Sequence, residues 1–126
     1  MLHQRGDCFV SLTKGEGWGL GAFDAAGHGN CVIMTGFGGQ LDYLDNENAY
    51  LVDYRLTPAR DDFARSSFMP DQNWAEADIQ HAARLMKYVY SHQEEARAKA
   101  ARLQRRILQD FSEQAVVPRF LEVLNS

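Results

Sequence analysis

Three short apolar runs occur in the first half of the chain, at residues 8–12, 31–35 and 49–52. The first is rich in strand-forming residues, and the second shows no alternation between apolar and polar positions. A continuous apolar run of this length is typical of a strand that is covered on both faces, as in a parallel sheet. The pattern therefore predicts three buried parallel strands.

The segment between the first two runs predicts a short helix. Four apolar positions share one helical face there: Leu20, Ala22, Phe23 and Ala26. Gly27 and Gly29 follow, and glycine commonly ends a helix in the left-handed conformation. A strand, a helix and a parallel strand form a right-handed crossover. Residues 8–54 are therefore predicted to form the sheet part of an α/β domain.

The middle of the chain lacks a sustained period. Residues 40–44 fit one helical turn, and residues 45–48 are a cluster of turn-forming polar residues. Residues 55–73 contain two prolines and several charges, so we predict a long irregular loop. Loops of this length in compact domains are usually functional or mobile.

A helical tail is predicted for residues 74–126. Apolar positions recur every three or four residues over 76–91 and 94–111, which indicates two helices joined near His92. Ser112 is placed to cap a last helix.

Composition limits the class of protein. With 126 residues, the chain fits a single domain spanning residues 1–126. The formal net charge of −4 argues against a nucleic-acid partner. No apolar run approaches the roughly 18 residues of a membrane span, which excludes an integral membrane segment. The first residues lack the apolar core of a signal peptide, and we expect a cytoplasmic protein.

Two groups of side chains invite a chemical interpretation. One basic cluster falls on the predicted tail, where nearby acids favour a solvated helix face: Lys99, Arg102, Arg105 and Arg106. Cys8 and Cys31 each begin an apolar run, so we expect reduced core residues. Neither has a partner at metal-ligand spacing, and no metal site is predicted.

The strongest candidate for a binding site is the glycine-rich stretch at residues 15–39. Gly17-x-Gly19-x-x-Ala22 follows a strand and opens a helix, as in dinucleotide-binding proteins. That fingerprint requires an acid at the end of the next strand to hold a ribose, and none is present here. A phosphate-binding P-loop requires lysine after the glycines, whereas Lys14 precedes them.

A sugar attached to a diphosphate suits this stretch better. Backbone amides at a helix N-terminus bind phosphate, and the Glu16 carboxylate can accept hydrogen bonds from sugar hydroxyls. Asp24 lies eight residues later, so both carboxylates can face one cleft. The alternative is structural: Glu16 is a solvated turn residue and Asp24 a helix-surface residue.

Residues 16–33 resemble the donor-binding segment of family 4-like glycosyltransferases (glycosyl transferases group 1) of the GT-B fold. In that family an acid, seven residues and a second acid are followed by a helix, a glycine and a strand, as between Glu16 and Asp24. The match continues through residues 35–39 and 48–52. The resemblance implies a partial, Rossmann-like GT-B C-terminal domain and retaining transfer of a sugar from a nucleotide-sugar donor, without a metal or other cofactor.

The resemblance also implies roles for individual residues. Glu16 corresponds to the catalytic-site acid that contacts donor-sugar hydroxyls, and Asp24 to the acceptor of hydrogen bonds from the ribose. Backbone amides near the sugar and diphosphate complete the implied donor-binding set: Gly17, Trp18, Gly19, Leu20, Gly38 and Gly39. Two positions depart from the family, because Asp24 stands where glutamate is usual and Gly21 where larger residues are common.

The resemblance begins partway into the donor domain and includes no acceptor-binding domain. The strand at residues 8–12 would then expose an apolar edge. We expect this edge to be covered by residues 1–7, by self-association or by a missing N-terminal domain. The alternative function is a non-catalytic nucleotide-sugar-binding or interaction module from a truncated or split glycosyltransferase.

Overall fold

The structure is a computed structural model that describes residues 2–59 and 71–126. The first half contains η1 (Leu2–Gln4), β1 (Cys8–Ser11), α1 (Leu20–Gly27), β2 (Cys31–Thr35), η2 (Gly39–Asp42) and β3 (Tyr50–Val52). The second half contains β4 (Tyr54–Pro58), β5 (Asn73–Ala77), α2 (Ile79–Ser91), α3 (Gln93–Asp110) and α4 (Glu113–Asn125).

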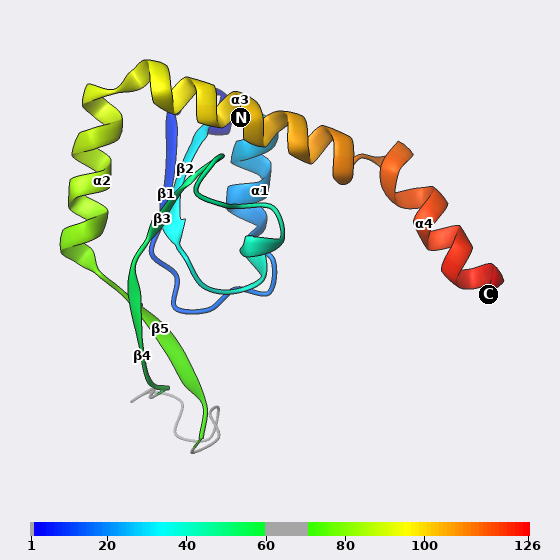
Figure 1. Cartoon of the computed structure of the whole chain (residues 1–126), viewed down its shortest axis with the longest axis horizontal. Helices are drawn as coiled ribbons and strands as arrows, with labels where there is room; N and C mark the ends of the chain where they lie inside the picture. The colour runs from blue at the N-terminus through cyan, green and yellow to red at the C-terminus, as the bar shows by residue number, and fades with distance from the viewer. Residues whose placement is uncertain (1, 60–70) are drawn as a thin grey trace.

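The predicted three-stranded parallel sheet is confirmed, with strand order β1-β2-β3. The register places Cys8 opposite Cys31 and Ile33 opposite Tyr50. In Figure 1, α1 and α2 lie on opposite sides of the sheet, and α3 crosses the end where the strands begin. The middle strand β2 is fully buried, whereas β1 is only half-buried because it forms an edge of the sheet.

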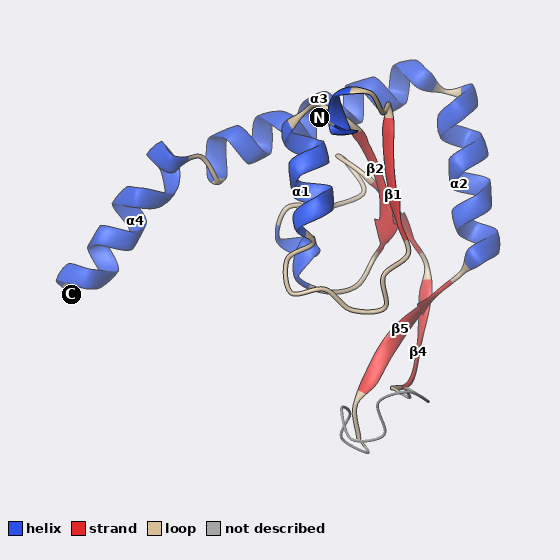
Figure 2. Ribbon diagram, turned by 180° about the vertical axis from the view of Figure 1, so that it is seen from behind, coloured by secondary structure: helices blue, strands red, loops and turns tan. Residues whose placement is uncertain are grey.

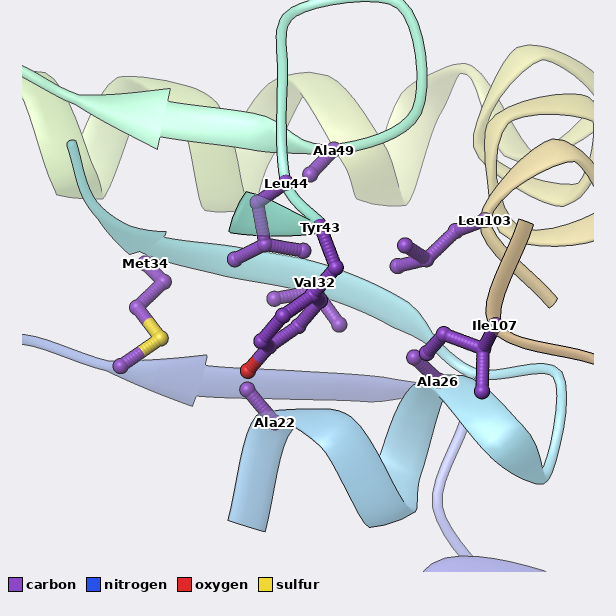
Figure 3. Packing of buried hydrophobic residues seen from close by; sticks show 9 residues of the cluster. All are labelled: Ala22, Ala26, Val32, Met34, Tyr43, Leu44, Ala49, Leu103 and Ile107. Carbon is purple, nitrogen blue, oxygen red and sulfur yellow. The ribbon is translucent and has the colours of Figure 1, made fainter. Parts of the chain in front are cut away.

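The face of the sheet toward α1 is closely packed. Val32 and Met34 of β2 meet a buried cluster from four other segments (Figure 3): Ala22, Ala26, Tyr43, Leu44, Ala49, Leu103 and Ile107. Phe9 of β1 packs against this cluster and lies beneath Gly21. A Cβ atom added to Gly21 would come within 3.1 Å of the Phe9 ring. The glycine therefore makes room for Phe9 under the start of α1.

The opposite face of the sheet packs against small residues of α2 and α3. Alternate residues of β2 and β3 point to this side, as the pleat of a strand requires. They form a second cluster with the two helices: Cys31, Ile33, Tyr50, Val52, Ala82, Ala96 and Ala100. Val32 packs in the first cluster and Ile33 in the second, so both faces of β2 are buried. This explains why the sequence of β2 is a continuous apolar run.

The prediction of an irregular loop at residues 55–73 is wrong at residues 55–58 and at Asn73, which belong to strands. Residues 54–58 and 73–77 form the antiparallel hairpin β4–β5, which extends from the carboxyl ends of the parallel strands (Figure 2). Residues 60–70 of the predicted loop lie outside the described part of the chain.

The helical tail was also predicted to start too early, at residue 74. The alanines and glutamate of β5 favour a helix, but pairing with β4 overrides this propensity. The Ala75 N–H also donates to the Lys14 carbonyl at 2.8 Å. Helix α2 begins only at Ile79, after Asp78 caps it by accepting a hydrogen bond from the His81 N–H at 2.9 Å.

The predicted junction of two helices near His92 is confirmed, but the solvated basic face is not. Three of its four cations bind the segment between η2 and β3. Arg102 donates to the Glu47 carbonyl at 2.8 Å, and Arg106 forms an ion pair with Asp45 at 2.7 Å. Lys99 donates to the Asn46 and Ala49 carbonyls. The cations therefore anchor α3 to this turn.

The last helix, α4, extends away from the sheet (Figure 1) and contains no buried residue. Ser112 occupies its predicted N-cap position, although its side chain makes no capping hydrogen bond. Within residues 2–59 and 71–126, no helix has the length and apolar character needed to span a membrane.

Candidate functional site

Two glycine-rich turns, at residues 15–19 and 36–39, follow the carboxyl ends of β1 and β2 and interlock there. The Gly39 N–H donates to the Glu16 carbonyl at 2.9 Å. A Cβ atom added to Gly39 would lie 1.8 Å from the Gly17 carbonyl oxygen, far inside contact distance. Both turns therefore open at the same end of the sheet, and their backbones are in direct contact.

Two further glycines adopt conformations that other residues rarely take. Gly19, at the N-cap of α1, has φ 77°, and Gly38, at the N-cap of η2, has φ 113°. A Cβ atom on Gly38 would also lie 2.8 Å from the Glu16 carbonyl oxygen. These positions require glycine for the path of the backbone itself.

The Tyr43 hydroxyl binds the backbone of the first turn. It lies 2.9 Å from the Gly19 carbonyl and 3.0 Å from the Trp18 carbonyl, so its single proton is shared between two acceptors. The side chain is fully buried in the cluster of Figure 3. The turn is therefore fixed to the core of the α1 face.

The ring of Trp18 belongs to an aromatic cluster under the same turn. Its centroid lies 5.2 Å from those of Tyr43 and Phe111 and 5.6 Å from that of Phe23. Edge and tilted contacts of this kind are favourable for aromatic rings. The ring of Trp18 is therefore partly buried against the core of the α1 face.

The two candidate carboxylates flank this supported turn. Glu16 is half-buried and Asp24 is exposed. Among the described residues, neither side chain has a hydrogen-bond or ion-pair partner. Burial raises the pKa of the Tyr43 hydroxyl, and the charges of Glu16 and then Asp24 raise it further. Both carboxylates therefore act on the same hydroxyl.

The N-terminus of α1 complements these acids. Gly19 provides no side-chain cap, and the first backbone hydrogen bond into the helix is donated by Phe23 to the Gly19 carbonyl at 3.0 Å. Leu20, the first residue of α1, is 69% exposed. Amides in the first helical turn point toward the end of the helix, where its dipole favours an anion. The site thus combines amide donors with carboxylate acceptors.

Buried oxygen atoms at this edge were not singled out by the sequence analysis. Within the described residues, three have no hydrogen-bond partner: Thr13 Oγ1, Thr35 Oγ1 and Gln40 Oε1. Gln40 also donates from Nε2 to the carbonyls of Thr35 and Phe37, which holds the second turn in place. Unpartnered buried polar atoms are rare in folded proteins. For the two threonines the sequence signal was a polar residue at the end of an apolar run, whereas Gln40 lies in η2 and carried no such signal.

A hollow of about 500 Å³ lies between the first turn and the β4–β5 hairpin. It is lined by Thr13, Lys14, Gly15, Phe37 and Trp74, among others. The Lys14 ammonium lies 4.1 Å from the centre of the Trp74 ring, a cation–π contact. Gly15, which lines the hollow, precedes Glu16 in the sequence, but Glu16 itself does not line it. Across residues 2–59 and 71–126, no cluster of metal-binding side chains is assembled.

Comparison with known proteins identifies the fold. No protein-family model and no curated protein matches the chain. Among solved structures, it is similar to one described as the crystal structure of Anabaena Alr3699/HepE in complex with UDP and glucose, with a TM-score of 0.74 and 16% sequence identity. The similarity covers 98% of this chain but 28% of that chain. The fold is α/β, with a three-stranded parallel sheet and C-terminal helices, and matches part of a GT-B glycosyltransferase domain.

Proposed function

We propose that this chain is the donor-binding part of a glycosyltransferase and that the interlocked turns bind a nucleotide sugar. The observation that carries the proposal is that the two turns interlock at the carboxyl ends of parallel strands, where α1 begins without a side-chain cap and Glu16 stands in the first turn. Open α/β sheets bind ligands at this end. The similarity to a structure in complex with UDP and glucose supports the same ligand class.

In this proposal the two acids recognise hydroxyls and the amides recognise phosphate. Glu16 accepts hydrogen bonds from the donor sugar, and Asp24 accepts them from the ribose. The amides of residues 17–20 and of Gly38 face the diphosphate. The Gly39 N–H is already donated to Glu16, so Gly39 contributes by holding the turns together.

We propose retaining transfer as the reaction, on the strength of the sequence resemblance. The bond from the sugar C1 to the diphosphate oxygen breaks, and a bond from C1 to an acceptor hydroxyl oxygen forms on the same face of the sugar. The hydroxyl proton leaves with the nucleoside diphosphate. Helix amides stabilise the charge that develops on the departing diphosphate, and no metal is required for this role.

The chain spans 28% of the length of its structural neighbour, so we propose that further polypeptide supplies the acceptor site. Within the described residues, the outer edge of β1 is unpaired, and Val10 is 39% exposed there. A strand from a missing N-terminal domain or from a second copy would pair with this edge. The partial coverage also favours the second candidate, a nucleotide-sugar-binding module that does not catalyse transfer.

Titration calorimetry with UDP-sugars and GDP-sugars tests the proposal. We expect the wild-type chain to bind at least one of them. Glu16→Ala and Asp24→Ala should each weaken binding about tenfold or more, since each removes a charged hydrogen-bond acceptor. Glu122→Ala, on the exposed helix α4, is the matched control and should bind like the wild type.

Failure of the wild type to bind any nucleotide sugar would overturn the site, as would equal binding by all three variants. Hydrolysis of the bound donor, followed as release of free sugar, separates the two candidate functions. Slow hydrolysis that Glu16→Ala abolishes supports an enzyme, whereas binding without any turnover supports the module.

A further inference from the structure

A second concave surface lies away from the glycine turns, on the side of the sheet that faces α2. The groove encloses about 460 Å³, within the range of small-molecule pockets of roughly 300–1,000 Å³. The residues that matter most in its lining are Cys8, Val10, Cys31, Met86, Val89 and Tyr90. Tyr90 and Met86 are 80% and 51% exposed, so the groove is open to solvent.

Two thiols stand side by side in this groove. Cys8 and Cys31 are directly opposite each other in the parallel β1–β2 pair. The Cys31 N–H donates to the Asp7 carbonyl at 3.3 Å, next to the pair. Both side chains belong to the α2 face and line the groove, Cys8 half-buried and Cys31 4% exposed.

The spacing of the strands suits a covalent link between these thiols. Neighbouring strands lie about 4.7–4.9 Å apart, and disulfide-bonded cysteines have Cα atoms about 4.4–6.8 Å apart. Directly opposed positions on neighbouring strands therefore meet the Cα distance requirement. Both cysteines are free thiols in the structure.

The two thiols differ in chemical character. A hydrogen bond from Cys31 lowers the pKa of the Cys8 thiol, although burial and the charge of Asp7 oppose this effect. Donating that hydrogen bond raises the pKa of Cys31, and burial raises it further. Because the thiolate is the nucleophile, the more exposed Cys8 is the better attacking group.

We propose that Cys8 and Cys31 form a dithiol site that reacts with low-molecular-weight disulfides entering the groove. The Cys8 thiolate attacks one sulfur of the disulfide, and the other sulfur leaves as a thiol after taking up a proton. Cys31 then attacks the Cys8 sulfur and releases the second thiol. In total, two cysteine thiols are oxidised to one disulfide, and one external disulfide is reduced to two thiols.

This site is distinct from the proposed donor site, which uses neither thiol. If another strand paired with the outer edge of β1, the two thiols could still react with each other, because strand pairing lies in the plane of the sheet. The Cys8 and Cys31 side chains point out of that plane, toward α2 and α3.

Treatment of the folded chain with glutathione disulfide, followed by intact-mass measurement and tryptic mapping, tests the proposal. The wild type should lose two hydrogen atoms and retain no glutathione. Trypsin should then yield residues 6–14 joined to residues 15–55, since cleavage follows Arg5, Lys14 and Arg55. Cys31→Ser should retain one glutathione on Cys8, because the second attack is lost.

Cys8→Ser is the matched variant, and its remaining thiol should react at least about tenfold more slowly than Cys8 in Cys31→Ser. In guanidinium the two variants should react at similar rates, which shows that the folded groove causes the difference. The proposal is overturned if the folded wild type accumulates a glutathione adduct without the joined peptides, or if both variants react equally fast when folded.

Discussion

The two faces of the β1–β2 pair are built differently. On the α1 face, Phe9 and Met34 meet a sealed cluster that includes Tyr43. On the α2 face, the same strands direct Cys8 and Val10 into an open groove of about 460 Å³. Successive side chains of a strand point to opposite faces of the sheet, so the same two strands contribute to both surfaces.

The difference shows what each face is suited to do. The sealed face supports the glycine turns, because Tyr43 binds the carbonyls of the first turn and the ring of Trp18 packs beneath it. A binding site is held in position when packed side chains fix its backbone. The open face leaves two thiols accessible instead. We therefore expect substitutions on the sealed face to disturb stability and the candidate donor site together.

The largest effect should come from truncating the sealed core. Leu103→Ala removes a fully buried side chain and should lower the free energy of unfolding by about 3 kcal/mol. Met86→Ala, in the open groove, should change it by less than about 0.5 kcal/mol, since half of the side chain is already in water. Urea unfolding followed by circular dichroism measures both, and equal losses would contradict the contrast between the faces.

A smaller loss is expected where the two turns interlock. Gly39→Ala places a methyl group against the Gly17 carbonyl and should cost about 2 kcal/mol, because the backbone of one turn must shift. Gly15→Ala is the control in the same stretch, since no atom lies within 4 Å of its added Cβ. Urea unfolding should separate the two variants. Equal stability of the two would show that the turns are not locked together.

The smallest effect concerns alkaline pH. The folded state raises the pKa of Tyr43 above its ordinary value of 10.0, so neutral Tyr43 stabilises the fold fully below about pH 10. This contribution is lost as the pH rises toward the folded pKa, by about 1 kcal/mol near pH 11. Tyr43→Phe should remove this part of the pH dependence in urea unfolding, whereas Tyr90→Phe, at an 80% exposed position, should leave it intact.

Much of the sheet could be predicted from the apolar pattern. The runs at residues 8–12, 31–35 and 49–52 contain the three parallel strands, and the short helix predicted between the first two runs is α1, Leu20–Gly27. Gly29 and not Gly27 adopts the left-handed conformation after that helix. Periodicity is informative for these elements because each has at least one buried face.

The hairpin β4–β5 could not be predicted in the same way. All but Thr57 of the β4 residues are exposed, so no burial pattern marks the strand. Trp74 and its neighbours in β5 have helix-favouring composition, and only pairing with β4 makes them a strand. The roles of Lys99 and Arg106 were missed for a related reason, since their partners lie about 50 to 60 residues away in sequence.

The sequence by itself determined the α/β class, the three buried parallel strands, the glycine-rich stretch and the acids within it. These features follow from local periodicity and from the conformations that glycine permits. Tertiary structure alone decided that Gly39 meets Gly17, that Tyr43 supports the first turn and that Cys8 faces Cys31. Such contacts depend on strand register and on packing between distant segments, which no local pattern of apolar and polar residues encodes.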